Sequence, residues 1–341
     1  MSITMRFILP TEAVIFSKWK GGGVMHNQIP RNAQYISRLK ESLARHYGIT
    51  AIEITPAKRG YYAETWRVRA HTGCYFLKMD FLAQHQEKLS CSLGVIEYLC
   101  DNGIDFVGRV VKTREGQLYI HFDTALAALF VWIEGENVET NDTKKPEYQM
   151  LCEIYRLTRP GLGILSASFS DAAAVRFYAQ WEQLKHAPPT EANRRALATL
   201  ERFADEMAHC ASRLSHFARR CQADTGHFYL THGDAGGNFF VSDGRNYILD
   251  WDEVMYAPPE RDAWVMGCCD WARKLFDDTL KANKIPYALH PERLAFYCYH
   301  MVFHYLGEFM MVHPISDQSE RIRDYLEDGW IRSRVQFADT L

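Results

Sequence analysis

The sequence predicts an α+β protein in which a small, mainly antiparallel β part precedes a large, mainly helical part. In residues 51–79, short runs of alternating apolar and polar side chains are separated by turn residues, which is typical of antiparallel strands. From residue 146 onward, apolar side chains recur about every three or four positions, which is typical of helices. We therefore expect residues 34–133 to form the small part and residues 134–341 the large one.

The composition is that of an ordinary globular protein. Of the 341 residues, 47% are hydrophobic and 24% charged, with a formal net charge of −3. This weak charge gives no reason to expect a nucleic-acid partner, which favours a basic surface. Because no apolar run of about eighteen residues occurs, we expect no membrane partner either. The nine cysteines include no C-x-x-C pair, so we expect reduced thiols in a cytoplasmic protein, and the oligomeric state stays open.

Residues 1–33 precede the first clear helix pattern and are interpreted as an N-terminal extension. Their apolar patches lack the long apolar run and the small-residue cleavage site of a signal peptide. A lysine and three glycines, residues 20–23, stand just before Met25. Since Lys and Gly codons are purine-rich, we interpret this run as a translated ribosome-binding site and Met25 as the true start.

The small part begins with a helix expected over residues 33–47. Its apolar stripe consists of Tyr35, Leu39 and Leu43, and Gly48 ends it. A second helix is expected over residues 84–100. The expected strands are residues 52–54, 65–69, 74–79, 118–122 and 126–133.

The large part contains several helix patterns. Tyr148, Leu151, Ile154 and Tyr155 share one face of its first helix, and Thr190 is a candidate N-cap further along. The remaining helices are expected over residues 172–184, 191–219, 263–281, 291–312 and 318–338.

A hairpin interrupts these helices. Two short apolar runs, residues 239–241 and 247–249, flank an Asp-Gly pair at residues 243–244, which is a strong signal for a two-residue hairpin loop. In that register Asn238 lies opposite Leu249, one step from Asp250. Asp234 stands just upstream. The open end of the hairpin, called the hairpin mouth below, is therefore expected to bring together an amide and two or more carboxylates.

Carboxylate and amide oxygens gathered in this way suit Mg²⁺. Asp, Asn and Gly are also ordinary turn formers, which is the alternative interpretation. The order His-x-Asp, then Asn, then a hairpin, then Asp is that of phosphoryl-transfer sites. It predicts that Asp234 is the catalytic base and that Asn238 and Asp250 are metal ligands.

Three segments in and around this hairpin resemble the aminoglycoside phosphotransferase family of the kinase-like superfamily. They are residues 231–234, 248–253 and 259–262, and residues 249–262 are most similar to the spectinomycin phosphotransferase branch. The resemblance implies a two-lobed, protein-kinase-like α+β fold that binds ATP or GTP with Mg²⁺. One feature departs from the family: three residues instead of four separate Asp234 from Asn238.

The resemblance also implies a nucleotide site in the small lobe. The turn with Gly60 and Tyr61 would cover the phosphates, although it also fits an ordinary hairpin loop. Lys78, in an apolar strand, resembles the phosphate-binding lysine of kinases, with a solvated edge lysine as the alternative. Glu87 is its expected partner on the next helix, unless that side chain is solvated.

The family hinge, whose backbone contacts the purine, corresponds to the end of the last strand and the polar connector that follows. Val131 and Ile133 are the expected contacts, and a plain linker is the alternative. Two further residues are assigned supporting roles. His232 is expected to be a buried strut for the catalytic loop, and Asp262 to hold the same loop through backbone hydrogen bonds.

The acceptor site is the least specified part. A cationic acceptor needs carboxylates, and the candidates are Asp252, Glu253, Asp270, Asp277 and Glu308. His300 and His304 share a helical face, and their aromatic surroundings favour packing or acceptor contact over metal binding. This aromatic stretch indicates a less cationic acceptor, or one bound by stacking.

We therefore predict an enzyme that transfers the γ-phosphate of ATP or GTP to a hydroxyl of a small aminoglycoside- or aminocyclitol-like substrate. One alternative is a metabolite kinase of the choline, homoserine or methylthioribose type. The other is a nucleotide-binding pseudokinase whose metal site is impaired by the short loop between Asp234 and Asn238.

Overall fold

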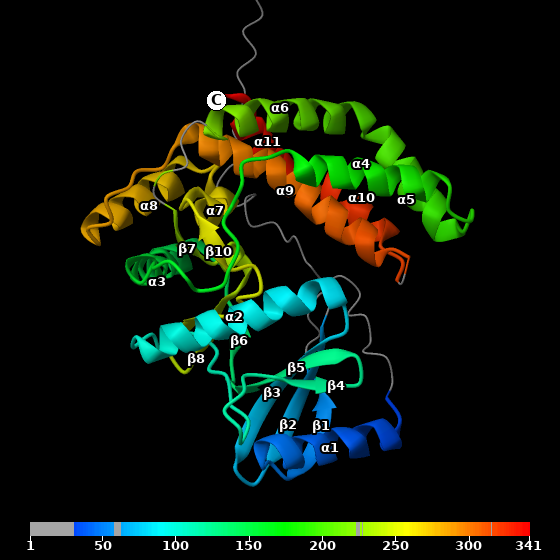
Figure 1. Cartoon of the computed structure of the whole chain (residues 1–341). Coiled ribbons are helices and arrows are strands. Elements are labelled where there is room, and N and C mark those ends of the chain that lie inside the picture. The colour runs from blue at the N-terminus through cyan, green and yellow to red at the C-terminus, as the bar shows by residue number, and fades with distance from the viewer. Residues whose placement is uncertain (1–30, 58–62, 223–225, 227, 315) are drawn as a thin grey trace, which may run out of the picture.

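The computed structural model describes residues 31–57, 63–222, 226, 228–314 and 316–341, and it has two lobes (Figure 1). Met25, Gly60 and Tyr61 lie outside the described residues, so the predictions about them stay predictions. The small lobe holds an antiparallel sheet and the large lobe is mainly helical, as predicted.

The sheet of the small lobe has the strand order β1-β2-β3-β5-β4, and all neighbouring strands are antiparallel. The pairs β1-β2, β2-β3 and β4-β5 join strands that are neighbours in sequence, whereas β3 pairs with β5 after α2 and β4 have intervened. The strands are β1 (Ala51–Pro56), β2 (Glu64–Ala70), β3 (Gly73–Asp80), β4 (Ile120–Phe122) and β5 (Ala125–Val131).

Helix α1 (Ala33–Tyr47) packs on this sheet through the predicted stripe. Tyr35, Leu39, Leu43 and Tyr47 are all buried there, and the helix ends at Gly48, whose φ of 71° is the left-handed conformation that glycine adopts readily. Helix α2 (Ala83–Asp101) packs in a second apolar cluster, which the hairpin of the large lobe also enters. Both helices confirm the predicted ones to within a residue or so.

The connector after β5 is more ordered than a plain linker. Strand β6 (Glu136–Asn137) pairs antiparallel with β8 (Phe239–Ser242), which in turn pairs with β9 (Arg245–Ile248). The hinge therefore forms one three-stranded sheet with the hairpin that carries the predicted metal ligands.

The large lobe surrounds helix α9 (Pro291–Val312), whose bounds match the prediction. Helices α4, α6, α10 and α11 pack against it in an aromatic-rich core (Figure 1). The other elements are η2 (Asn141–Thr143), α3 (Lys144–Arg156), α4 (Ala172–Lys185), α5 (Glu191–Arg202), α6 (Ala204–Gln222), β7 (Tyr229–Thr231), η3 (Ala235–Gly237), β10 (Met255–Ala257), α7 (Glu260–Ala263), η4 (Trp264–Met266), α8 (Asp270–Ala282), α10 (Ser319–Glu327) and α11 (Gly329–Asp339).

Three predicted continuous helices are each broken, which corrects the sequence-based bounds. The helix over 191–219 breaks at Phe203, whose side chain is buried in the core. The helix over 263–281 breaks between η4 and α8, where Cys269 is extended. The helix over 318–338 breaks at Asp328, also extended. In each case a helical pattern continues through the break, but packing redirects the chain.

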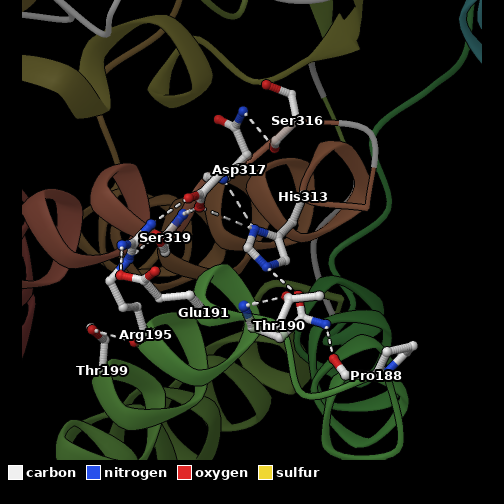
Figure 2. A network of polar contacts seen from close by, with 11 residues as sticks. Pro188, Thr190, Glu191, Arg195, Thr199, His313, Ser316, Asp317 and Ser319 are labelled. Carbon is white, nitrogen blue, oxygen red and sulfur yellow. Dashed lines mark hydrogen bonds and ion pairs between the residues drawn. The ribbon is translucent and has the colours of Figure 1, made fainter.

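A polar network joins the start of α5 to the turn between α9 and α10 (Figure 2). The His313 ring accepts the backbone N–H of Gln318 at Nδ1 (3.0 Å), and its Nε2 donates to the side-chain oxygen of Asn193 (2.9 Å). Arg195 pairs with Glu191 at 2.8 Å and with Asp317 at 2.6 Å.

Across the part of the chain that is described, no helix combines the length and apolar character needed to cross a bilayer.

Candidate active site

The hairpin forms in the predicted register. Ser242 lies opposite Arg245, and the two loop residues take positive φ angles of 47° and 76°, at Asp243 and Gly244 respectively. At the open end, the N–H of Leu249 donates to the carbonyl of Asn238 at 3.0 Å. Asn238 and Asp250 are thereby brought to the same mouth although twelve positions separate them in the sequence.

The shortened loop between Asp234 and Asn238 folds as a single 3₁₀ turn, η3. The Asn238 amide donates to the Asp234 backbone carbonyl at 2.7 Å and to Asp234 Oδ2 at 3.1 Å. Gly236 allows the turn to lie against Val265, because a Cβ at this glycine would lie 3.0 Å from the valine Cγ1. The short spacing therefore still places the amide beside the carboxylate.

His232 supports this loop from behind, as predicted. Its Nδ1 accepts the Asp234 N–H at 3.2 Å, so Nε2 carries the proton and donates to the Leu249 carbonyl at 2.9 Å. Burial lowers the pKa of His232 to about 4, which keeps the ring neutral. The ring therefore links the catalytic loop to the strand end that precedes Asp250.

Asp262 holds the same loop through its backbone, which agrees with the supporting role predicted for it. Its carboxylate accepts the N–H of Gly233 at 2.6 Å, the N–H of His232 at 3.4 Å and the hydroxyl of Tyr155 at 2.8 Å. Gly233 has a φ of 86°, and a Cβ there would overlap the Arg261 guanidinium. A glycine is needed at this position for both reasons.

Asp234 is a partly buried carboxylate with few compensating charges. Tyr305 donates a hydrogen bond to its Oδ1 at 3.3 Å, from helix α9. Burial, together with the negative charges of Asp250 and Glu253, raises the pKa of Asp234 to about 7. A carboxylate of this kind accepts a proton readily near neutral pH.

Lys78 reaches across from strand β3 to the hairpin mouth. Its Nζ lies 2.7 Å from Asp250 and 2.6 Å from Asp252, and these two account for its ion pairs among the described residues. Although burial opposes it, the two carboxylates raise the pKa of Lys78 above its ordinary value. The same lysine lowers the pKa of Asp250, whose φ of 62° places it in the left-handed region seen at strained functional positions.

The predicted pair of Lys78 with Glu87 is wrong. Glu87 is exposed on α2, and the acids that hold the lysine come instead from the large lobe. The physical reason is that Lys78 can bridge directly to the hairpin mouth, whereas sequence spacing cannot show which of several acids a lysine reaches. The lysine consequently ties the two lobes together.

At the hinge, the two residues predicted to contact the purine differ in whether the backbone N–H is already hydrogen-bonded. The Val131 amide donates to the Arg109 carbonyl at 3.0 Å, and the Trp132 amide donates to Cys74 at 3.2 Å. Ile133 is the next residue along, and its amide has no backbone acceptor among the described residues. Of the two predicted residues, Ile133 is therefore the one whose N–H remains available.

The model of the phosphotransferase enzyme family, APH, matches residues 53–297, well over half of the chain. The chain belongs to this family. The match includes the predicted nucleotide-binding lysine and every residue of the hairpin mouth. No protein in the curated set matches the sequence.

Solved structures of this family share the fold of the chain at low sequence identity. The spectinomycin phosphotransferase APH(9)-Ia, solved with ADP and spectinomycin, has a TM-score of 0.74 and 18% identity, covering 92% of this chain and 100% of its own. Amicoumacin kinase hAmiN, solved with AMP-PNP, Ca²⁺ and Ami, has a TM-score of 0.58 and 13% identity, covering 91% of this chain and 94% of its own. A microcompartment-associated aminopropanol kinase has a TM-score of 0.58 and 13% identity, covering 89% of this chain and 96% of its own. The predicted family and two-lobed kinase-like fold are confirmed.

The donor atoms at the hairpin mouth of this phosphotransferase fit a hard divalent cation. Because the Asn238 amide nitrogen is committed to Asp234, its Oδ1 remains for a ligand, and Asp250 binds Lys78 through Oδ1 only. In the described ranges no group of three or more His, Cys, Asp and Glu side chains forms a metal cage. Such an incomplete protein set suits Mg²⁺, which takes its other ligands from waters and substrate phosphates.

The carboxylates predicted to bind a cationic acceptor are mostly engaged elsewhere. Asp252 pairs with Lys78, and Asp270 is 94% exposed and pairs with Arg273 in its own helix. Glu253 pairs with Lys88 at 3.0 Å and with Arg261 at 3.6 Å. Asp277 accepts the Leu289 N–H at 2.9 Å, and Glu308 is partly buried on α9. Asp270 and Asp277 therefore make local contacts in and beside α8, and their role toward an acceptor stays a prediction.

The structure adds site residues that sequence reasoning missed. Tyr305 contacts the carboxylate of Asp234, the predicted base, and Lys88 pairs across the lobes with Glu253. The signal for Tyr305 was present, since it directly follows His304 in the aromatic stretch of the predicted helix. No local signal exists for Lys88, because its partner lies 165 positions away.

Proposed function

We propose that this protein transfers the γ-phosphate of ATP or GTP to a hydroxyl group of a small aminoglycoside- or aminocyclitol-like acceptor. One observation carries the proposal. A strand lysine, Lys78, bonds Asp250 at the same hairpin mouth where Asn238 bonds Asp234. This arrangement supplies a base, two metal ligands and a cation for the phosphates, which phosphoryl transfer needs.

Each residue has a distinct part in the proposed reaction. Asn238 and Asp250 would hold Mg²⁺, which when bound supplies positive charge against the phosphate oxygens. With a nucleotide bound, Lys78 would contact its phosphates instead of the two carboxylates, which would leave Asp250 free to hold the metal. Phosphoryl transfer requires little covalent chemistry from the protein. The protein would therefore accelerate it mainly by positioning the substrates and neutralising their charge.

Asp234 accepts the proton of the attacking hydroxyl. His232 and Asp262 fix the loop that carries it, and Tyr305 orients one of its carboxylate oxygens. The other oxygen accepts a hydrogen bond from the Asn238 amide, so both carboxylate oxygens are held in defined orientations. A base held in this way keeps the acceptor hydroxyl in line with the phosphate.

The nucleotide base would lie at the hinge, with the Ile133 amide as a hydrogen-bond donor. Relatives solved with ADP or AMP-PNP support a nucleotide site, and those solved with spectinomycin and amicoumacin support a hydroxylated small-molecule acceptor. The aminopropanol kinase among the relatives keeps a metabolite kinase as the second candidate within the same chemistry.

Thermal stability with nucleotides tests this function. ATP or GTP at about 100 times its Kd stabilises a protein by about 2.7 kcal/mol, and here the effect should require Mg²⁺. Slow nucleotide hydrolysis without acceptor should accompany it. The Asp250→Asn variant, which tolerates the positive φ, should lose most of the Mg²⁺-dependent stabilisation. Stabilisation that does not depend on Mg²⁺, without hydrolysis, would instead indicate a nucleotide-binding pseudokinase, and the absence of both stabilisation and hydrolysis would also reject the proposal.

A further inference from the structure

One stripe of helix α9 is only partly covered in a largely buried helix. His300, His304, Glu308 and Met311 recur at helical spacing along it, and each is partly exposed. Gln84 of α2 contacts the Met311 sulfur at 2.6 Å, so the stripe borders the small lobe. These four residues are called the α9 stripe below.

The α9 stripe begins beside the proposed catalytic base. Tyr305, which follows His304 directly, donates to Asp234 at 3.3 Å, and the rings of His304 and Tyr305 are 5.4 Å apart. The rings of His300 and His304 stack at 6.1 Å with 19° between their planes. The stripe therefore lies next to the tyrosine that contacts Asp234.

Polar atoms of this region are left without protein partners. Neither imidazole of the stripe forms a hydrogen bond with any described residue, and Nδ1 of His300 is buried without a hydrogen-bond partner. On the facing helix α4, Gln180 donates to the Gly307 carbonyl at 3.2 Å, while its Oε1 is also buried without a partner. Unused donors and acceptors at this density are uncommon in a folded protein.

The two imidazoles are neutral at physiological pH. Burial and neighbouring positive charges lower the pKa of His300 to about 3 and that of His304 to about 4. A neutral imidazole offers one donor and one acceptor, which matches a hydroxyl group. An ammonium group has donors only and is better matched by carboxylates.

The charges around the imidazoles also disfavour a polycation. Arg176, Arg261 and Lys88 act on His304 from three elements, and the negative charge of Glu253 that acts on it is already paired with Lys88 and Arg261. Burial raises the pKa of Glu308 to about 7, so its negative charge is incomplete near neutral pH. The field at the stripe is therefore not the acidic one that an oligoamine requires.

We propose that the α9 stripe is the acceptor subsite and that it selects a neutral or weakly cationic polyhydroxylated compound, with His300 and His304 hydrogen-bonding to its hydroxyls. This inference rests on the proposed function, because it narrows the acceptor class of that same site. It places His300 and His304 as specificity-determining residues and excludes compounds with several ammonium groups as preferred acceptors.

A graded series of probes tests the preference. Suitable probes are myo-inositol and methyl glucoside without amino groups, glucosamine with one, spectinomycin with methylamino groups, and kanamycin with several amino groups. Binding to the full chain with a non-hydrolysable nucleotide and Mg²⁺ is measured by calorimetry, and phosphate transfer is measured separately with ATP and with GTP. We expect affinity and kcat/KM to fall as amino groups increase.

Substitutions that add a carboxylate should reverse this order. His304→Asp is expected to raise the kanamycin-to-inositol ratio of affinities by about tenfold or more, and Gln180→Glu should act in the same direction from α4. His304→Asn, which keeps a neutral donor and acceptor, should preserve the order. His121→Asp, on the exposed edge of β4, makes the same charge change far from the stripe and should leave the ratio unchanged.

The results separate the two proposals. A wild-type protein that prefers kanamycin, that binds none of the probes, or whose ratio is unmoved in both carboxylate variants overturns the assignment of the stripe, while nucleotide-dependent phosphate transfer keeps the proposed function. Binding in the expected order without any transfer supports the stripe as a polyol subsite and rejects the enzyme. Because two variants on different helices are used, misfolding of one leaves the other decisive.

Discussion

Two buried histidines of this protein make the same kind of hydrogen bonds in very different surroundings. His232 accepts a backbone N–H at Nδ1 and donates from Nε2 to the Leu249 carbonyl. His313 accepts the Gln318 N–H at Nδ1 and donates from Nε2 to Asn193 (Figure 2). Both are neutral, with a pKa lowered by burial.

The difference lies in the charges and backbone beside each ring. Next to His232, Asp250 has a strained positive φ, and the pKa of Asp234 is raised by burial and like charges. Next to His313, the exposed Arg195 and Asp317 neutralise one another. Imbalanced charge and local strain are features of functional sites, whereas paired charge at a helix junction stabilises the fold. The imidazole alone therefore does not distinguish a catalytic support from a structural one.

The largest expected effect is on catalysis at the first region. Asp234→Ala removes the proposed base and should lower kcat by about 10²- to 10⁴-fold, with nucleotide affinity nearly unchanged. Steady-state kinetics and nucleotide titration of the same sample measure both. A variant within tenfold of wild-type kcat would contradict the assigned base.

Lys78→Met comes next. It leaves Asp250 and Asp252 close together without their cation and removes a phosphate contact, so kcat/KM for the nucleotide should fall by about 10²- to 10³-fold. Lys185→Met is the matched control, because Lys185 lies near the end of α4 and pairs only with Glu182 among the described residues. Equal effects of the two substitutions would reject the role of Lys78.

A pair of acid-to-amide substitutions compares the two regions directly. Asp262→Asn weakens charge-assisted bonds to the catalytic loop and should cost about 2 kcal/mol of unfolding free energy and up to about 100-fold in kcat. Asp317→Asn, which weakens a bond to the first amide of α10, should cost about 1 kcal/mol or less and leave kcat unaltered. Denaturant unfolding and kinetics give both quantities, and a kcat loss in the second variant would break the distinction.

The smallest effect is a pH dependence of stability. The folded-state pKa of His313 is lower than its unfolded value near 6.5, so the unfolded chain binds more protons in acid. Its contribution to stability is therefore complete above about pH 6.5 and is lost as the pH falls through the folded pKa. His313→Gln should flatten the acid slope of unfolding free energy by at most about 1.4 kcal/mol per pH unit. An unchanged slope would show that the ring is not held neutral.

Local patterns predicted much of the fold. The stripe of α1 and its glycine end, the hairpin register and the bounds of α9 all follow from residues close in sequence. The three broken helices and the pairing of β6 did not follow, because buried side chains such as Phe203 and strands distant in sequence decided them.

The candidate site divides in the same way. Sequence order brought Asp234, Asn238 and Asp250 together, since a hairpin of known loop length fixes which residues meet. It could not select the partners of Lys78, which lie 172 and 174 positions away, and it assigned Glu87 instead.

By itself, the sequence determined the elements whose contacts lie within a helix turn or a hairpin, and with them the meeting of Asp234, Asn238 and Asp250 at the hairpin mouth. The tertiary structure alone decided that Lys78 bridges the lobes, that Tyr305 reaches the base and that the α9 stripe is bordered by arginines and a lysine. The physical reason is that spacing along a chain specifies neighbours only where the backbone is regular. Charges and rings from distant segments meet only after the lobes have packed.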